Sequence, residues 1–220
     1  MLKLKALQYV MAPITCMLIS LGLAFGFSSA FAAGPSLEDL KTKLSQVSSL
    51  EAQFTQTVFN EKNKLLRKQM GNFWLKKPGL LRWERKNPKH ILIIDGQHIW
   101  DYDPDLLQVV KTKINAKQHN TPMYLLFNDP NNFGKHFKLK RYFTKEDLEI
   151  FELDPNQQNQ GFGWIRVSFT KKTKVLSALE FEDVLSQRIL IKFSNVQHNK
   201  PISENLFKFS PPKNVDLIQN

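Results

Sequence analysis

The chain has 220 residues, of which 31 are Lys or Arg and 20 are Asp or Glu, so its formal net charge at pH 7 is +11. It contains a single cysteine, which excludes a fold held together by internal disulfide bonds. A positive charge of this size is typical of proteins that meet nucleic acid, an anionic membrane surface or an acidic partner.

The first 32 residues have the pattern of a secretory signal peptide. Lys3 and Lys5 precede an apolar stretch over residues 14–27, and Ala30-Phe31-Ala32 places small residues at the two positions that a signal peptidase reads. We therefore expect cleavage after Ala32, which leaves residues 33–220 as a single domain outside the cytoplasm.

An uncleaved membrane anchor is the alternative, because residues 9–27 are nearly long enough to span a bilayer. Pro13, Gly22 and Gly26 interrupt that stretch and favour cleavage. The cysteine, Cys16, lies inside the segment and is not preceded by a lipoprotein-type Leu-small-small run. The mature protein is thus expected to be neither lipidated nor disulfide-bonded.

Cleavage would leave 29 basic and 20 acidic residues, a net charge of +9. The basic residues are scattered, with a small cluster at Lys171-Lys172-Thr173-Lys174, where a hairpin turn is predicted. A solvated strand face explains most of this charge, and export argues against a nucleic-acid partner.

A helix is predicted directly after the cleavage site. Ser36 followed by Asp39 is a variant of the capping box that begins helices. Apolar residues then recur at spacings of three and four to form one stripe, namely Leu37, Leu40, Leu44, Val47 and Leu50. This helix must cover another apolar surface.

After Ser49 the hydrophobic period changes from that of a helix to that of strands, and short turns such as Pro78-Gly79 and Asp95-Gly96 separate the strands. The predicted strands cover residues 52–59, 65–75, 80–85, 91–94, 98–102, 107–111, 137–143, 148–153, 164–170, 175–182 and 188–196. About eleven antiparallel strands with no dividing linker indicate one β domain.

A short apolar helix is predicted between the two series of strands. Thr121 before Pro122 is a helix start, and Met123, Leu126 and Phe127 form one apolar face that ends before Pro130. This helix could be a plug that fills the core or a movable lid, and the sequence leaves both interpretations open.

Alternate residues of a strand point to opposite faces of a sheet, so parity groups the apolar side chains. The residues predicted to line one concave surface are Phe73, Leu75, Leu81, Trp83, Trp100 and Tyr102. A curled sheet of this size encloses more volume than its own side chains readily fill. Ordinary core packing and a cavity for lipid both remain open.

The sequence contains no recognisable catalytic constellation. Its five histidines show no metal-ligand spacing, and no Gly-x-Ser-x-Gly elbow or glycine-rich phosphate loop occurs. Asp101, Asp103 and Asp105 form the tightest carboxylate cluster, but their position around Pro104 favours turn capping. We predict a non-enzyme that needs neither a cofactor nor a metal.

Five segments together resemble the LolA family, the periplasmic lipoprotein carriers of Gram-negative bacteria. In order they read VSSLEAQFTQ, GNFWLKKPGLLRW, ILIIDGQHIWDYDP, NTPMYLLF and FKFSPPKNVDL, and they span nearly the whole mature chain. The resemblance implies a mainly β fold, an open and incomplete antiparallel β-barrel with an N-terminal helix and a short helical lid.

The resemblance also implies a function as a periplasmic carrier. Such a protein takes lipoproteins from an ATP-driven inner-membrane transporter (an ABC transporter), shields their acyl chains in an apolar cavity and delivers them to an outer-membrane receptor. The six aromatic and aliphatic residues above would form the cavity, Pro122, Met123, Leu126 and Phe127 the lid, and a monomer is expected.

One position departs from the family pattern. Lys77 stands where the family commonly has an arginine that hydrogen-bonds lid residues, so Lys77 is the candidate latch, with Asn120 and Thr121 as candidate partners. Lysine keeps the charge but lacks the planar fork of arginine.

Two other functions are compatible with parts of the sequence. A protein of the same fold could bind another amphiphile, such as a glycolipid, because apolar strands do not specify a headgroup. A hydrolase acting on an anionic envelope polymer would use the basic surface, but it lacks a nucleophile and an organised acid pair.

Overall fold

The computed structural model describes residues 34–114, 122–128, 133–156 and 161–220, all within one compact unit of residues 33–220. The expected signal peptide lies outside these residues, and its cleavage remains a prediction. The described elements are α1 (Leu37–Ser45), β1 (Ser49–Phe59), β2 (Leu65–Lys76), β3 (Leu80–Lys86), β4 (Lys89–Asp95), β5 (His98–Asp103), β6 (Gln108–Lys113), α2 (Pro122–Asn128), α3 (Phe133–His136), β7 (Phe137–Lys145), β8 (Leu148–Pro155), β9 (Phe162–Thr170), β10 (Leu176–Asp183), β11 (Arg188–His198), η1 (Glu204–Phe207) and β12 (Asp216–Gln219). None of the described helices is long and apolar enough to cross a membrane.

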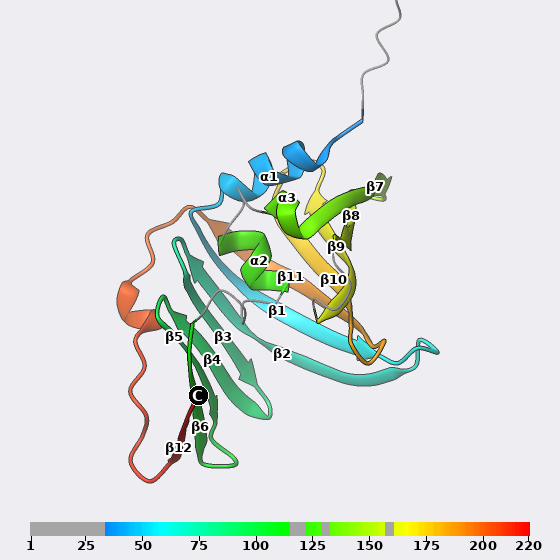
Figure 1. Cartoon of the computed structure of the whole chain (residues 1–220). Coiled ribbons are helices and arrows are strands. Elements are labelled where there is room, and N and C mark those ends of the chain that lie inside the picture. The colour runs from blue at the N-terminus through cyan, green and yellow to red at the C-terminus, as the bar shows by residue number, and fades with distance from the viewer. Residues whose placement is uncertain (1–33, 115–121, 129–132, 157–160) are drawn as a thin grey trace, which may run out of the picture. The chain divides into compact units, whose positions relative to one another are not determined.

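The described strands form one twelve-stranded sheet in the order β12-β6-β5-β4-β3-β2-β1-β11-β10-β9-β8-β7 (Figure 1). The two ends of this order, β12 and β7, are not paired with each other, so the sheet stays open. All pairings are antiparallel except that of β12 with β6, which is parallel. The structure confirms the expected open, mainly antiparallel β fold and the eleven predicted strands.

The twelfth strand was not predicted from the sequence. All of its residues are exposed, so it has no alternation of buried and exposed positions. Its pairing with β6 depends on backbone hydrogen bonds between segments far apart in the sequence, such as Asp216 N to Leu107 O at 2.8 Å. A local pattern cannot reveal such a strand.

Helix α1 begins where the capping box predicts. The Ser36 hydroxyl accepts a hydrogen bond from Asp39 N, and the Asp39 carboxylate accepts one from Ser36 N at 2.6 Å. Leu40 and Leu44, on the predicted apolar stripe, are fully buried. Helix α1 ends at Ser45, so Val47 and Leu50 of the predicted stripe lie outside it, and Leu50 belongs to β1.

The hairpin turns lie along two opposite borders of the sheet, formed by the ends of the strands, and these two borders differ. The turns β2–β3 and β4–β5 lie at the edge next to α1, since Ser49 at the start of β1 pairs with Lys76 at the end of β2. We call this the closed edge. The turns β1–β2, β3–β4, β5–β6 and β10–β11 lie at the opposite edge, which we call the open edge.

The concave face of the sheet carries the main core. Phe54, Phe73, Leu75 and residues of β8, β9 and β10 are buried there, and α1 and α2 pack against the same cluster. Figure 1 shows α1 across the closed edge and α2 on the concave side. The helices therefore bury apolar surface that a closed barrel would bury by itself.

The convex face has two different coverings. Over β3, β4 and β5 it packs against the segment that follows β11, with Phe207 almost fully buried. Over β7 to β11 it carries a ladder of alternating charges that needs no covering segment. Its members are Arg141, Glu152, Arg166, Glu180 and Arg188, with contacts of 2.8, 2.7, 3.1 and 2.7 Å in that order.

Glu152 is the buried centre of this ladder. Burial by itself raises the pKa of its carboxyl group, but hydrogen bonds from Arg141 and Arg166 outweigh burial and hold the pKa at about 2. The convex arginines of these strands are thus engaged in pairs within the sheet.

Gly71 allows the aromatic packing in the middle of the concave face. A Cβ atom at this position would lie 1.9 Å from the backbone oxygen of Glu84 and 2.6 Å from the ring of Phe54. The absence of a side chain lets Phe54 stack on Trp83, with ring centroids 3.7 Å apart.

We expect Gly71→Ala to lower the free energy of unfolding by about 2 to 3 kcal/mol, because the added methyl group must displace backbone as well as a buried ring. Urea unfolding followed by circular dichroism measures this change. Gly34→Ala is the matched control, since a Cβ there meets no atom within 4 Å. Equal stability of the two variants would contradict the close approach at Gly71.

Candidate functional site

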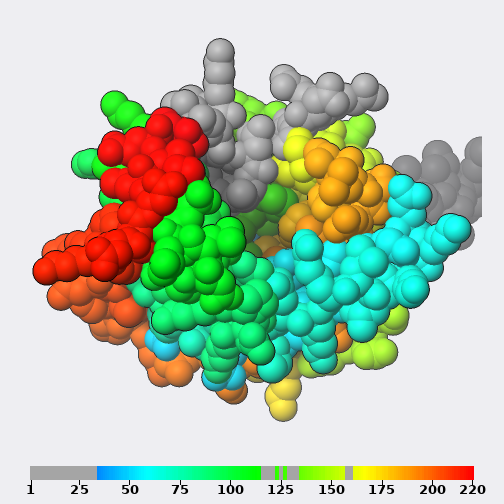
Figure 2. All heavy atoms as spheres, turned by 90° about the horizontal axis from the view of Figure 1, so that it is seen from below, coloured from blue at the N-terminus to red at the C-terminus, as the bar shows by residue number. Residues whose placement is uncertain are grey.

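A pocket of about 490 Å³ opens on the concave face, toward the open edge of the sheet. Figure 2 looks onto this edge and shows a hollow between the green residues of β4 to β6 and the orange residues of β10 and β11. Its lining residues are Gln56, Arg67, Gln69, Leu81, Trp83, Arg85, His90, Leu92, Ile94, Ile99, Pro122, Met123, Gly161, Leu179, Phe181 and Ile191.

Most of the pocket wall is apolar and comes from two halves of the sheet. One wall consists of residues of β3, β4 and β5, with Leu81 paired to Ile94 and Ile94 to Ile99. The opposite wall comes from β10 and β11, where Leu179 pairs with Ile191. A ligand with hydrocarbon chains would contact both walls.

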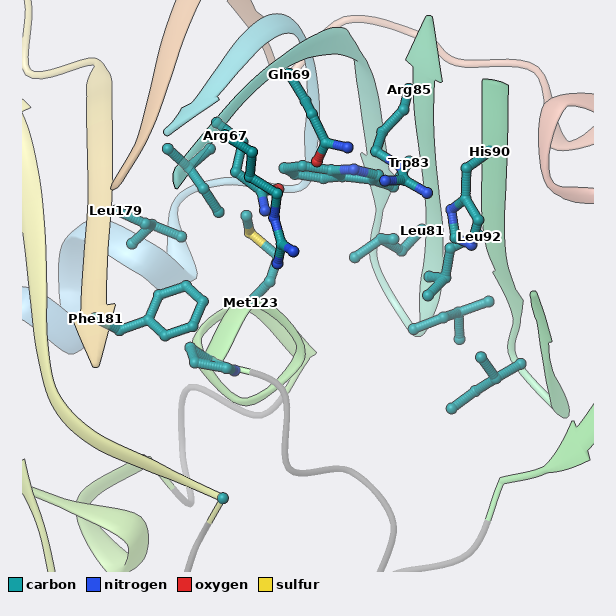
Figure 3. A pocket seen from close by; sticks show the side chains of 16 residues that line it. Arg67, Gln69, Leu81, Trp83, Arg85, His90, Leu92, Met123, Leu179 and Phe181 are labelled. Carbon is teal, nitrogen blue, oxygen red and sulfur yellow. The ribbon is translucent and has the colours of Figure 1, made fainter. Parts of the chain in front are cut away.

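The rim of the pocket is polar on one side only. Gln56 of β1, Arg67 and Gln69 of β2, Arg85 of β3 and His90 of β4 line it, and Figure 3 shows both guanidinium groups directed into the pocket. The Asp101 Oδ1 atom lies 2.5 Å from His90 Nε2. Basic and amide groups therefore border the apolar interior.

The predicted cavity residues of β2 and β3 lie on the concave face, but at two depths. Leu81 and Trp83 line the pocket. Phe73 and Leu75 are fully buried in the core and pack deeper, with Phe73 edge-on to Trp83 at 5.7 Å between ring centroids. They support the pocket wall without lining it.

Trp100 and Tyr102 require a correction. The register pairs Ile94 with Ile99 and Ile93 with Trp100, so Ile99 faces the pocket and the two aromatic residues face the convex side. There each packs against Phe209 at 5.6 Å between ring centroids. The prediction that they line the concave surface is wrong, because parity within a strand does not tell which of its two faces is concave.

The predicted lid residues of α2 also divide into residues that line the pocket and residues that are buried in the core. Pro122 and Met123 line the pocket, whereas Leu126 and Phe127 are almost completely buried in the core. One end of the helix thus borders the pocket while the other is anchored. Movement of α2 as a lid stays a prediction.

Lys77 lies at the closed edge and contacts α1. Its Nζ donates a hydrogen bond to the carbonyl oxygen of Leu44 at 2.6 Å, and its backbone N–H donates to Ser48 O at 2.8 Å. Leu44 is in the last turn of α1, where carbonyl groups lack helical partners and a cation is favourable. The expected partners Asn120 and Thr121 lie outside the described residues.

A second cation also attaches α1 to the sheet. Lys43 Nζ lies 2.8 Å from the Oε1 atom of Glu149, a carboxylate that is 6% exposed. Burial raises the pKa of the Glu149 carboxyl group, but the hydrogen bond from Lys43 outweighs it and the pKa is lowered. Helix α1 is therefore held by two lysines at its C-terminal end.

The sequence interpretation missed the polar rim and the second wall. Arg67, Gln69 and Arg85 share the parity of Phe73 and Trp83, so extending that parity toward the strand ends would have found them. Parity could not have identified Leu179 and Ile191 as pocket residues, because their position opposite β3 depends on the curvature of the whole sheet.

The carboxylate cluster around Pro104 serves the turn. Asp103 Oδ1 accepts hydrogen bonds from the backbone N–H groups of Asp105 and Leu106, at 3.0 and 3.1 Å. Within the part of the chain that the structure describes, no group of three or more His, Cys, Asp or Glu side chains is placed to hold a metal ion.

Comparison with known proteins gives consistent results. The family model described as "Outer membrane lipoprotein carrier protein LolA" matches residues 45–210. An outer-membrane lipoprotein carrier protein of Nitrosomonas europaea is 31% identical over 186 residues, which cover 84% of this chain and 89% of that protein. A protein of the same name from Coxiella burnetii is 31% identical over 187 residues, covering 82% and 87%.

A solved structure has a similar fold. An uncharacterized conserved protein from Thermus thermophilus aligns with a TM-score of 0.52 over 83% of this chain and 98% of that chain. The two sequences are 11% identical, so this likeness concerns the fold alone.

Lys77 should make stability depend on pH. Burial lowers its pKa from 10.5 to about 8, so holding its ammonium form costs free energy in the folded protein. As the pH rises from about 8 to about 10, the folded state loses this proton before the unfolded state does. We expect the free energy of unfolding to rise by about 1 to 3 kcal/mol relative to Lys77→Arg, whose guanidinium stays protonated.

Urea unfolding at about pH 7.5 and about pH 10 tests this expectation. The change in the free energy of unfolding between the two pH values is compared in parent and variant, because this difference separates the effect of Lys77 from that of lysines that titrate normally. An identical pH dependence in both proteins would show that Lys77 is no more buried than an ordinary surface lysine.

Proposed function

The chain belongs to the LolA family of outer membrane lipoprotein carrier proteins, and from this membership we propose that it carries lipoproteins with their acyl chains in the pocket on its concave face. The observation that supports the proposal most directly is the mainly apolar pocket between β3–β5 and β10–β11. The family is one of carriers and chaperones rather than enzymes, and an apolar pocket of this kind needs no catalytic group.

The physical need for such a carrier follows from the hydrophobic effect. Each methylene group that leaves water contributes about 0.8 kcal/mol, so three acyl chains with roughly 45 methylenes resist transfer into water by about 36 kcal/mol. A pocket that takes up acyl chains in place of the bilayer lowers this barrier. Its affinity must stay below that of a membrane, because cargo has to be released.

Several features suit a site that binds and then releases. The sheet is open at β12 and β7, so its two halves can change their separation without breaking a closed ladder of hydrogen bonds. Met123 in the pocket wall has a flexible side chain that adapts to different chain positions. We propose that α2 acts as the lid and that Lys77, through α1, favours the closed arrangement.

The cellular setting follows from the same proposal. Export by the N-terminal signal and cleavage after Ala32 would place the carrier in the periplasm. There it would receive cargo from an inner-membrane lipoprotein-releasing ABC transporter and deliver it to an outer-membrane receptor. A monomer suits this route, because transfer requires a free pocket mouth.

Trp83→Glu tests the pocket directly. The variant places an unpaired carboxylate on the apolar wall, so we expect the affinity for an acyl-chain fluorophore to fall at least about tenfold. Trp74→Glu is the matched control, since Trp74 lies on the same hairpin but on the convex face, where it pairs with Arg82. Circular dichroism reports whether each variant is folded.

Trp83 also stacks on Phe54, so Leu92→Glu provides a second probe of the same wall without that stacking. Unchanged fluorophore binding in folded Trp83→Glu and Leu92→Glu would refute binding in this pocket. Transfer of a triacylated lipoprotein from inner-membrane vesicles into a soluble complex with the parent chain then tests carriage itself.

A further inference from the structure

The concave face changes from apolar to polar along three neighbouring strands. Toward the open edge, β2 presents Phe73, Gly71, Gln69 and Arg67 in this order. The neighbouring strands β3 and β4 show the same change from apolar to polar residues. In β3 the order is Leu81, Trp83 and Arg85, and in β4 it is Ile94, Leu92 and His90. The apolar residues lie deep, and each strand ends at the rim in a basic or amide side chain.

Register places two basic residues of this rim side by side, and a third lies on the same face of the neighbouring strand β2, farther toward the open edge. Arg85 pairs with His90, and Gly71, which lies on the same face of β2 as Gln69 and Arg67, pairs with Arg85. We call Arg67, Arg85 and His90 the basic rim. The opposite wall differs, because Leu179, Phe181 and Ile191 remain apolar at the same pocket.

The arginines of the basic rim lack partners within the described part of the chain. Among those residues, neither Arg67 nor Arg85 makes a side-chain hydrogen bond or an ion pair, although both line the pocket. On the convex face, in contrast, Arg141, Arg166 and Arg188 each contact a glutamate. The pocket arginines are free to bind a ligand.

His90 has a further unsatisfied group. Its Nε2 atom lies 2.5 Å from Asp101 Oδ1, while its Nδ1 atom is buried and has no hydrogen-bond partner among the described residues. Buried polar atoms are normally hydrogen-bonded, so an unsatisfied one at a pocket indicates a polar group of a ligand or a water molecule. Figure 3 shows His90 next to Arg85 at the same side of the pocket.

We propose that the basic rim binds an anionic group, a carboxylate or a phosphate, of an amphiphile whose hydrocarbon chain occupies the apolar part of the pocket. Guanidinium groups bind both anions with paired hydrogen bonds, and a neighbouring apolar wall strengthens such contacts. The inference rests on the proposed function, since it uses the same pocket, and it specifies which amphiphiles that pocket prefers.

The test compares ligands that share one acyl chain and differ in the head. Lysophosphatidylglycerol and palmitate are anionic, monopalmitoylglycerol is neutral, and each displaces an acyl-chain fluorophore from the full mature chain. We expect the anionic ligands to bind about tenfold more tightly than the neutral one at low salt. The Arg67→Gln/Arg85→Gln variant should lose this preference and keep its affinity for the neutral ligand within about twofold.

Lys68→Gln/Lys86→Gln is the matched control. Lys68 and Lys86 adjoin the two arginines in β2 and β3, are exposed and point to the other face, so the variant loses the same charge outside the pocket. Retained anion preference in this control supports the basic rim. An equal loss in both double variants would show a general effect of surface charge and overturn the proposal.

These outcomes distinguish a failure of the basic rim from a failure of the proposed carrier function. If the parent binds the neutral and anionic ligands equally, the basic rim has no headgroup role, although the pocket still binds acyl chains. If the parent binds none of them, the proposed carrier function fails as well. Lipidated peptides with Asp or Asn next to the acylated residue then distinguish an acidic cargo residue from a free anionic lipid as the source of the charge.

Discussion

An open sheet with an apolar concave face needs another element to cover that face, and the rest of the structure depends on this constraint. Because β12 and β7 do not pair, the sheet curls over Phe54, Phe73 and Leu75 without closing into a complete barrel. Helix α1 covers the closed edge, α2 packs on the concave face, and together they leave the pocket toward the open edge. The site is therefore the part of the concave face that the chain's own described helices do not fill.

The two faces of β3, β4 and β5 show how one sheet can have both a core and a binding surface. On the convex face the segment after β11 supplies Phe207 and Phe209 and packs against the aromatic residues of β5. On the concave face, Leu81, Trp83 and Ile99 remain at a pocket. The two faces differ in what covers them.

The attachment of α1 fits the proposal that the covering helices separate from the sheet during carriage. Buried leucines give the helix its place, but its C-terminal end is held by Lys77 on a backbone carbonyl and by Lys43 on Glu149. Such contacts involve few atoms and depend on the charge of a lysine. A carrier needs this balance, because a cover that cannot open prevents both loading and release.

The local elements of this protein could be predicted from the residues alone. The period of two predicts the strands, the Ser36–Asp39 pair predicts the start of α1, and proline bounds predict α2, because these signals depend on neighbouring residues. Parity also placed Leu81 and Trp83 together. Five segments in order indicated the family, which the family match over residues 45–210 shows.

Which face of each strand is concave depends on the tertiary fold. Parity defines two faces but does not name them, so Trp100 and Tyr102 were assigned to the pocket although register puts Ile99 there. The same limit concealed Arg67 and Arg85, whose charge suggests solvent until the curvature of the sheet turns them toward an apolar wall. Strand β12 and the wall of β10 and β11 depend on pairings and curvature between distant segments, which no local pattern of residues encodes.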